Sequence, residues 1–144
     1  MRRRLSNTLY QATCVAIEGR GVLIEGPPGS GKSSLALALI DRGAMLIGDD
    51  GVLLEPRGDR LHASPAPAIV GKLEIRNLGL LDFPTLADVA VALVLILDCA
   101  APRFRDGPDW IDRVGCRLPG ISLWPDSPVL ALRAEWALRT YGRT

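Results

Sequence analysis

A glycine-rich segment, residues 26–33, carries the strongest chemical signal in the sequence. It reads Gly-Pro-Pro-Gly-Ser-Gly-Lys-Ser and matches G-x-x-x-x-G-K-S/T at every fixed position. Glycines let successive backbone N–H groups surround a phosphate, a helix start adds partial positive charge, the lysine reaches the outer phosphates and the serine can ligate Mg²⁺. Pro27 and Pro28 lack N–H groups, so anion contacts are expected mainly from Gly29 to Ser33. The predicted nucleotide contacts are Gly26, Pro27, Pro28, Gly29, Ser30, Gly31, Lys32, Ser33 and Ser34.

Two adjacent carboxylates, Asp49 and Asp50, follow a short apolar run 16 and 17 residues after Ser33. Neighbouring side chains of an extended chain point in different directions. One carboxylate can therefore face a nucleotide and its metal while the other reaches an acceptor hydroxyl as a general base. Because Asp-Asp-Gly is also good turn chemistry, a solvated turn is the alternative interpretation. The residues alone do not rank Asp49 against Asp50.

A second charged pair, Glu74 and Arg76, falls on one side of a predicted strand in the segment Leu-Glu-Ile-Arg. A carboxylate beside a guanidinium would suit the transfer of a metal-bound phosphate. A solvated strand face explains the same pattern without any chemistry. Arg113, in Ile-Asp-Arg-Val-Gly, carries no such pattern and by itself resembles any surface arginine.

Short apolar runs separated by glycine and proline predict the elements that position these residues. Strands are expected at 14–17 and 22–25, joined by a tight turn, so the chain enters Gly26 from a strand. A helix is predicted from 32 to 42, because apolar residues recur there at helical spacing and Gly43 can end it in a left-handed conformation. The order strand, glycine loop, helix is the setting that the phosphate-binding motif requires.

The rest of the chain predicts further strands and one more helix. Apolar runs at 45–47, 52–55 and 60–63 indicate strands, the last two forming a hairpin. Residues 89–97 form a nine-residue apolar run that predicts a buried strand, and 130–141 has the apolar spacing of a helix. Mixed strands and helices imply an α/β domain.

The composition is that of one ordinary globular domain. A length of 144 residues favours a single domain, and 48% hydrophobic residues with a net charge of +1 disfavour disorder or a generally basic nucleic-acid surface. The longest apolar run is far shorter than the roughly 20 residues that cross a bilayer. Three scattered cysteines outside any CxxC spacing indicate neither a disulfide framework nor a zinc site, and favour a reducing cytoplasm. The tryptophans Trp110, Trp124 and Trp136 are expected in the core.

Five segments together resemble the catalytic domain of the HPr kinase/phosphorylase family. The resemblance covers about residues 9–120 well, and the stretch Leu-Glu-Ile-Arg-Asn-Leu-Gly-Leu-Leu-Asp is much more specific to this family than the phosphate loop. Full-length members carry a further N-terminal domain. We therefore expect residues 1–144 to be a single catalytic domain of a short form that lacks it. In the family's order, the segments are 26–33, 42–43, 49–50, 73–82 and 112–115.

The resemblance implies a fold and an activity. The fold would be a P-loop core related to phosphoenolpyruvate carboxykinase. The activity would be ATP- and Mg²⁺-dependent phosphorylation of a serine on HPr, the phosphocarrier of the phosphotransferase system. From the composition and the short apolar runs we expect no nucleic-acid partner and no membrane insertion. Family members are commonly hexamers, so a homo-oligomer is implied as well.

The resemblance also assigns roles by position. The lysine would hold the β and γ phosphates, one aspartate of the adjacent pair would take the serine proton, and the arginines would stabilise the transferring phosphoryl charge. The implied catalytic residues are Lys32, Asp49, Asp50, Arg76 and Arg113, and the implied metal ligands are Ser33 and Glu74.

The sequence departs from the family where the family has an active-site histidine. Alignment places Gln11 there, and the lone histidine, His62, lies elsewhere. Glutamine cannot exchange a proton near neutral pH, so the hypothesis is a kinase with little or no phosphorylase activity. The glutamate that usually follows the loop serine is Ser34. Two alternatives stay open: a P-loop kinase acting on another substrate, and a nucleotide-binding regulator without turnover.

Overall fold

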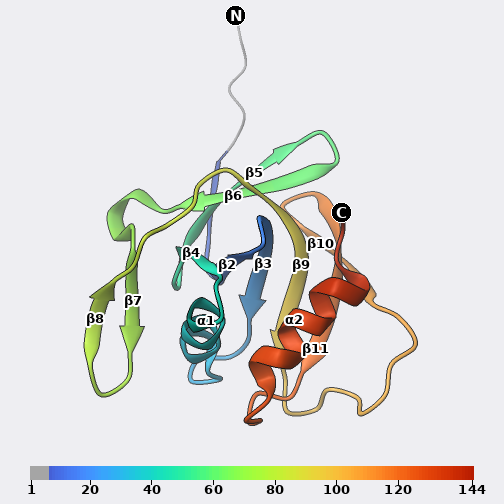
Figure 1. Ribbon diagram of the computed structural model, residues 1–144. Coiled ribbons are helices and arrows are strands. Elements are labelled where there is room, and N and C mark those ends of the chain that lie inside the picture. The colour runs from blue at the N-terminus through green and yellow to red at the C-terminus, as the bar shows by residue number, and fades with distance from the viewer. Residues whose placement is uncertain (1–6) are drawn as a thin grey trace, which may run out of the picture.

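A long apolar strand, β9 (Val89–Leu97), lies at the centre of the main sheet (Figure 1). The structure is a computed structural model that describes residues 7–144. Strand β9 pairs in parallel with β3 on one side and with β11 on the other, and its first residues pair antiparallel with β6. The sheet is therefore mixed rather than purely parallel. The elements are β1 (Thr8–Tyr10), β2 (Thr13–Ile17), β3 (Arg20–Glu25), α1 (Lys32–Asp41), β4 (Met45–Gly48), β5 (Val52–Arg57), β6 (Arg60–Pro65), a short 3₁₀ turn (Pro67–Ile69), β7 (Lys72–Ile75), β8 (Gly79–Asp82), β9, β10 (Asp109–Arg113), β11 (Cys116–Leu123) and α2 (Leu130–Tyr141).

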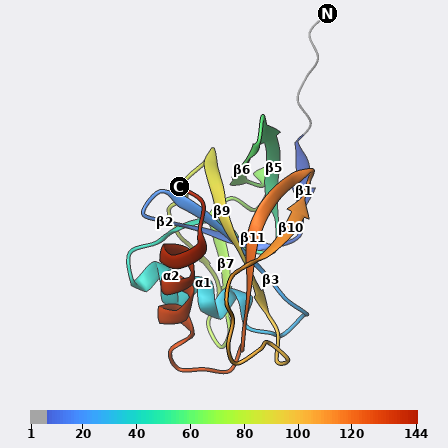
Figure 2. The ribbon, with the colours of Figure 1, turned by 90° about the vertical axis from the view of Figure 1, so that its right-hand side faces the viewer.

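The main sheet runs in the order β1-β5-β6-β9-β3-β2-β4, with β11 and β10 branching from β9. Strands β7 and β8 form a separate hairpin that extends from one side of the molecule (Figure 1). Figure 2 shows both helices on the same side of β3, β9 and β11. The α/β class expected from the sequence is confirmed, with more strand than the sequence indicated.

Alternation along the central strands creates two cores. Val22 and Ile24 of β3 contact the cluster that includes Leu35 and Leu39 of α1, whereas Leu23, between them, contacts the other cluster. Successive side chains of a strand point to opposite faces, so a strand covered on both faces must be apolar throughout. Burial of both faces explains why β9 is an unbroken apolar run. The same burial holds β3 in place, so the end of β3, where the phosphate loop begins, has a fixed position.

The helices and the central strand match the sequence predictions closely. Helix α1 begins at Lys32, α2 spans the predicted 130–141, and β9 spans 89–97. The hairpin expected at 52–63 is present as β5 and β6. No helix within residues 7–144 is long and apolar enough to cross a bilayer.

The structure corrects the prediction for the three tryptophans. Trp110, Trp124 and Trp136 are 53%, 39% and 61% exposed, so the prediction that they pack in the core is wrong. Each ring instead lies under an arginine guanidinium, at 4.8 to 5.8 Å from its centroid. The buried members of both cores are aliphatic residues and cysteines, and none of the three tryptophans belongs to either core.

Candidate active site

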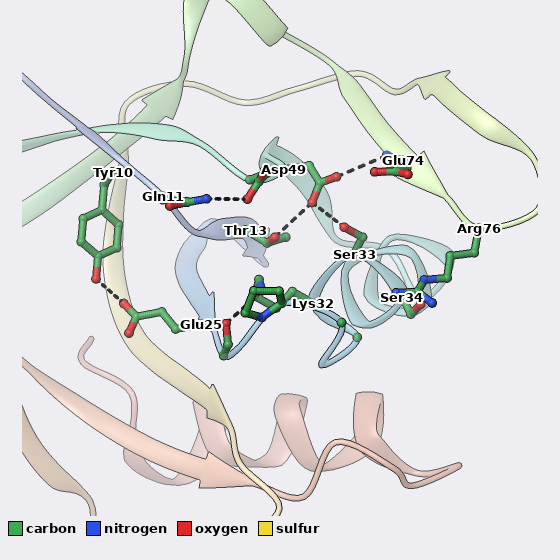
Figure 3. Close-up of a pocket in the computed structure, with 15 residues that line it drawn as sticks. Tyr10, Gln11, Thr13, Glu25, Lys32, Ser33, Ser34, Asp49, Glu74 and Arg76 are labelled. Carbon is green, nitrogen blue, oxygen red and sulfur yellow. Dashed lines mark hydrogen bonds between the residues drawn. The ribbon is translucent and has the colours of Figure 1, made fainter.

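Most of the residues singled out from the sequence meet in a cavity of about 660 Å³ where β3 ends and α1 begins (Figure 3). Strands β1, β2 and β4 supply one wall, and the β7–β8 hairpin supplies the other. The cavity lies at the carboxyl end of β3, a strand in the parallel part of the sheet, which is where α/β folds bind ligands. Its lining is Tyr10, Gln11, Thr13, Glu25, Gly26, Pro28, Gly29, Gly31, Lys32, Ser33, Ser34, Asp49, Asp50, Glu74 and Arg76.

The phosphate loop needs its glycines. At Gly26 a side chain would lie 3.1 Å from the carbonyl oxygen of Leu97, so the loop could not pack this closely against β9. Gly31, with φ of +100°, has the left-handed backbone that turns the chain into α1. Helix starts leave backbone N–H groups unpaired. The buried hydroxyl oxygen of Ser30 also has no hydrogen-bond partner within residues 7–144. The loop therefore fits a phosphate group.

Lys32 holds the two ends of the loop together. Its Nζ donates to the carbonyl oxygens of Gly26 at 3.0 Å and Pro27 at 3.2 Å. The ammonium group lines the cavity and forms no ion pair with any residue from 7 to 144. Its positive charge is thus available to an anion bound in the cavity.

The two adjacent aspartates have different environments. Asp49 is 8% exposed, and its Oδ1 accepts hydrogen bonds from Ser33 at 2.7 Å and Thr13 at 3.0 Å. Its Oδ2 accepts the backbone N–H of Glu74 at 3.2 Å. Asp50 is exposed, has a left-handed backbone with φ of 61°, and accepts one long hydrogen bond from Gln11 at 3.4 Å. The Asp49 carboxylate is fixed against the loop serine (Figure 3), whereas Asp50 is exposed to solvent.

The β7–β8 hairpin brings Glu74 and Arg76 to the cavity. Leu73 is fully buried in the core beneath it, and β7 and β8 pair from Lys72–Asp82 to Ile75–Gly79. Both charged side chains are exposed. A Cβ at Gly29 would lie 4.0 Å from the guanidinium of Arg76, which therefore approaches the phosphate loop from the hairpin side.

A third cluster closes the side of the cavity opposite Arg76. Arg113 forms a two-point ion pair with Glu25, with N–O distances of 2.9 and 2.8 Å. The Tyr10 hydroxyl donates to the same carboxylate at 2.7 Å. Burial and the Glu25 carboxylate raise the pKa of Tyr10 to about 12, and the hydrogen bond to Glu25 raises the pKa of Arg113. Tyr10 and Glu25 line the cavity, whereas Arg113 lies behind them.

Comparison with known proteins identifies the family. Residues 3–91, more than half of the chain, match the family model described as the HPr Serine kinase C-terminal domain. The chain belongs to this family. A solved structure, the Hpr(Ser) kinase/phosphatase from Coxiella burnetii, superposes with a TM-score of 0.80 at 30% identity, covering 92% of this chain and 89% of that one.

Curated relatives of the HPr kinase domain match in sequence over part of their length. The HPr kinase/phosphorylase of Limosilactobacillus reuteri is 47% identical over 111 residues, which are 72% of this chain and 33% of that protein. The enzyme of the same name from Exiguobacterium sp. is 44% identical over 80 residues, 55% of this chain and 26% of that protein. The chain thus spans about a quarter to a third of the length of these relatives. The resemblance stated from the sequence is confirmed.

The structure brings most of the predicted site residues together. Lys32, Ser33, both aspartates and the Glu74–Arg76 pair line one cavity. Pro27, Ser30 and Arg113 do not line it, although all three are adjacent to residues that do. His62 lies on β6 beside Asp88 at 3.2 Å, outside the cavity.

Sequence reasoning missed three polar residues of the cavity: Tyr10, Thr13 and Glu25. Glu25 carried a usable signal, since it is an acidic residue at the end of an apolar strand, directly before the loop. Tyr10 carried none, because β1 is only three residues long and its pairing with β5 is set by distant contacts. Thr13, the first residue of β2, carried none because its partner Asp49 lies 36 positions away in the chain.

Proposed function

We propose that this chain transfers the γ-phosphoryl group of ATP to a serine hydroxyl of an HPr-type phosphocarrier protein, with Mg²⁺ as cofactor. The observation that carries the proposal is the pairing of a buried Asp49 on Ser33 with an exposed Asp50 beside it. Phosphoryl transfer needs one group on the metal side and one at the acceptor. The family supplies the acceptor class, since the matching domain is that of an HPr serine kinase.

Charge in the cavity supports a divalent cation. Four carboxylates line it (Glu25, Asp49, Asp50 and Glu74), against the two cations Lys32 and Arg76. A polyphosphate entering an acidic cavity must bring positive charge with it. Within residues 7–144 no three metal-ligating side chains form a ready-made metal site. That suits Mg²⁺, which binds one or two protein oxygens and completes its shell with phosphates and water.

Ser33 and Asp49 are the residues that would hold the cation, with Glu74 near its outer side. When bound, Mg²⁺ would neutralise phosphate charge and orient the β and γ phosphates. Lys32 would bind the same phosphates from the loop side. Lys32 and Ser33 are the first residues of α1, and Asp49 directly follows β4; both elements are anchored in the core.

Asp50 is the proposed general base. Both oxygens of Asp49 already accept hydrogen bonds in a buried position, whereas Asp50 is exposed to an incoming protein. The serine oxygen of the acceptor attacks the γ phosphorus, the bond to the β-phosphate oxygen breaks, ADP leaves, and the serine proton passes to Asp50. Arg76 stabilises the charge on the transferring group from the hairpin side. Arg113 could stabilise that charge only if its side chain broke the ion pair with Glu25 and turned toward the cavity.

Gln11 donates to Asp50 rather than exchanging a proton. We therefore propose a kinase with little or no phosphorylase activity. Phosphate-dependent release of pyrophosphate from phosphoserine-HPr, at a rate comparable to the forward reaction, would contradict this part of the proposal. A single domain, a cytoplasmic location and a homo-oligomer remain predictions from the sequence and the resemblance.

The test is transfer of labelled γ-phosphate from Mg·ATP to purified HPr, with Asp50→Asn and Asp49→Asn beside the wild type. We expect labelled phosphoserine with the wild type and its loss in Asp50→Asn while ATP still binds. Binding of ATP without labelling by the wild type would favour another acceptor or a regulator without turnover. A panel of small hydroxyl-containing metabolites then separates those two.

A further inference from the structure

The loops that follow β9 and β11 lie at the same edge of the sheet as the phosphate loop. Strands β3, β9 and β11 are parallel neighbours, so their carboxyl ends coincide. Gly26 approaches Leu97, the last residue of β9, and Leu97 is in register with Leu123, the last residue of β11. With strands about 4.8 Å apart, the edge from β3 to β11 spans roughly 10 Å.

A hollow of about 340 Å³ lies at the β11 end of this edge. Trp124 follows β11 directly and is 39% exposed, and its Nε1 donates to the carbonyl oxygen of Ala101 at 2.6 Å. That bond ties the loop after β11 to the loop after β9 and fixes the ring. Rigid aromatic surfaces bind flat partners at low entropic cost. The lining is Ala101, Pro102, Arg103, Ser122, Leu123, Trp124 and Arg133.

The hollow is basic as well as aromatic. The guanidinium of Arg133 lies 5.8 Å from the centroid of the Trp124 ring. Neither Arg103 nor Arg133 forms an ion pair with any residue from 7 to 144. Nucleic-acid bases stack on aromatic rings such as indole and on guanidinium planes, and cations without partners attract phosphates.

We infer that this hollow binds the nucleobase end of the nucleotide whose phosphates lie on residues 26–33. The inference rests on the proposed function for the phosphate end. It adds a subsite, with Trp124 and Arg133 as the stacking groups, and it orients the nucleotide along the sheet edge from β3 toward β11. In this orientation the γ phosphate faces Asp50 and the base lies on the far side of the loop.

The experiment compares two ligands on the full chain. Mg·ATP carries the base, whereas Mg·tripolyphosphate carries the phosphates alone. We expect Trp124→Ala to weaken Mg·ATP binding about 10- to 100-fold, the range for loss of one stacked base, and to leave Mg·tripolyphosphate binding within about twofold. Trp136→Ala is the matched control, because Trp136 also lies under an arginine but on the outer face of α2, and it should change neither affinity.

A second variant separates the loss of stacking from unfolding, and a second probe tests the base subsite without the phosphates. Trp124→Phe keeps a ring without the bond to Ala101 and should show an intermediate loss, which separates stacking from unfolding in Trp124→Ala. Equal loss for both ligands, or no loss for either, would overturn the base subsite. If tripolyphosphate does not bind the wild type, the proposed phosphate site is wrong. Binding of adenosine, measured as quenching of Trp124 fluorescence in a Trp110→Phe/Trp136→Phe background, then decides the base subsite alone.

Discussion

The two walls of the cavity are built differently. On the loop side, Ser33 and Asp49 are hydrogen-bonded to each other and Asp49 is buried. On the outer side, Asp50, which follows Asp49 in the chain, and Glu74 and Arg76 of the β7–β8 hairpin are exposed. The polar groups next to the phosphate loop are therefore held by the core, whereas the other charged groups of the cavity are displayed at the surface, as the proposed transfer from a small ligand to a protein requires.

The underlying elements explain the contrast. Helix α1 buries Leu35, Ala36 and Leu39 against the sheet, so its first residues cannot shift without disturbing the core. The β7–β8 hairpin has one fully buried anchor, Leu73, and exposes Leu78 and Leu80 by 68% and 65%. Surface elements with few buried contacts open at low free energy. Substitutions on the two walls should therefore differ in what they do to stability and to transfer.

The largest effect is expected from Lys32→Ala. Its Nζ contacts only loop carbonyls, so the midpoint of thermal unfolding should change little, whereas transfer to HPr should fall by about 1000-fold or more. Labelled-phosphate transfer and thermal unfolding measure the two quantities. Lys72→Ala is the control, because Lys72 pairs with Asp82 on the hairpin. Near-normal transfer by Lys32→Ala would remove the loop lysine from the mechanism.

Substitutions of the two aspartates should show the clearest difference between loss of transfer and loss of stability. Asp50→Asn should reduce transfer by about 100-fold or more, through loss of the base, and leave the free energy of unfolding unchanged. Asp49→Asn should lower the free energy of unfolding by about 1–3 kcal/mol, because the amide cannot accept all three hydrogen bonds. Denaturant titration and transfer assays at varied Mg²⁺ distinguish them. If Asp50→Asn keeps full transfer, the base assignment fails.

A smaller loss is expected from Arg76→Ala on the hairpin. The exposed guanidinium is partly solvated, so we expect a loss of about 10-fold in kcat, below the range for a fully buried donor. Stability should be unaltered, since Arg76 forms no ion pair within the described part of the chain. Arg117→Ala, which removes an exposed arginine from β11, is the control and should leave kcat unaffected. An equal loss in both variants would indicate a general charge effect.

The smallest effect concerns Tyr10 on the Glu25 side. Its pKa is raised to about 12 from an ordinary 10, so the folded state favours the protonated phenol. The corresponding stabilisation is complete below pH 10 and is lost as the pH rises from 10 to 12. Tyr10→Phe should flatten this part of the curve of unfolding free energy against pH. An identical slope in the wild type and the variant would show that Tyr10 does not titrate with the fold.

Local signals in the sequence were enough to predict the loop wall. The motif at 26–33 follows an apolar strand and opens a helix, and each of these elements has its own periodicity. The roles of the aspartates could not be separated, because burial of Asp49 depends on Thr13 and on the backbone of Glu74. Those contacts join residues 25 to 36 positions apart in the chain.

The β10–β11 pair was missed for a related reason. Its residues include exposed Trp110 and Asp112 beside Pro119 and Gly120, a composition that does not alternate clearly. Pairing with β9 determines where β11 lies. The partnership of Arg113 with Glu25, 88 positions away, follows from that pairing and from nothing local.

The backbone of Asp50 limits what can replace this residue. At φ of 61°, aspartate, asparagine and glycine fit with little strain, whereas alanine or a branched residue adds a steric cost. Exchange of the acid for its amide is therefore the least disruptive way for this fold to lose transfer while keeping the loop and the cavity. A relative with asparagine at this position is expected to act as a nucleotide sensor rather than as a transferase.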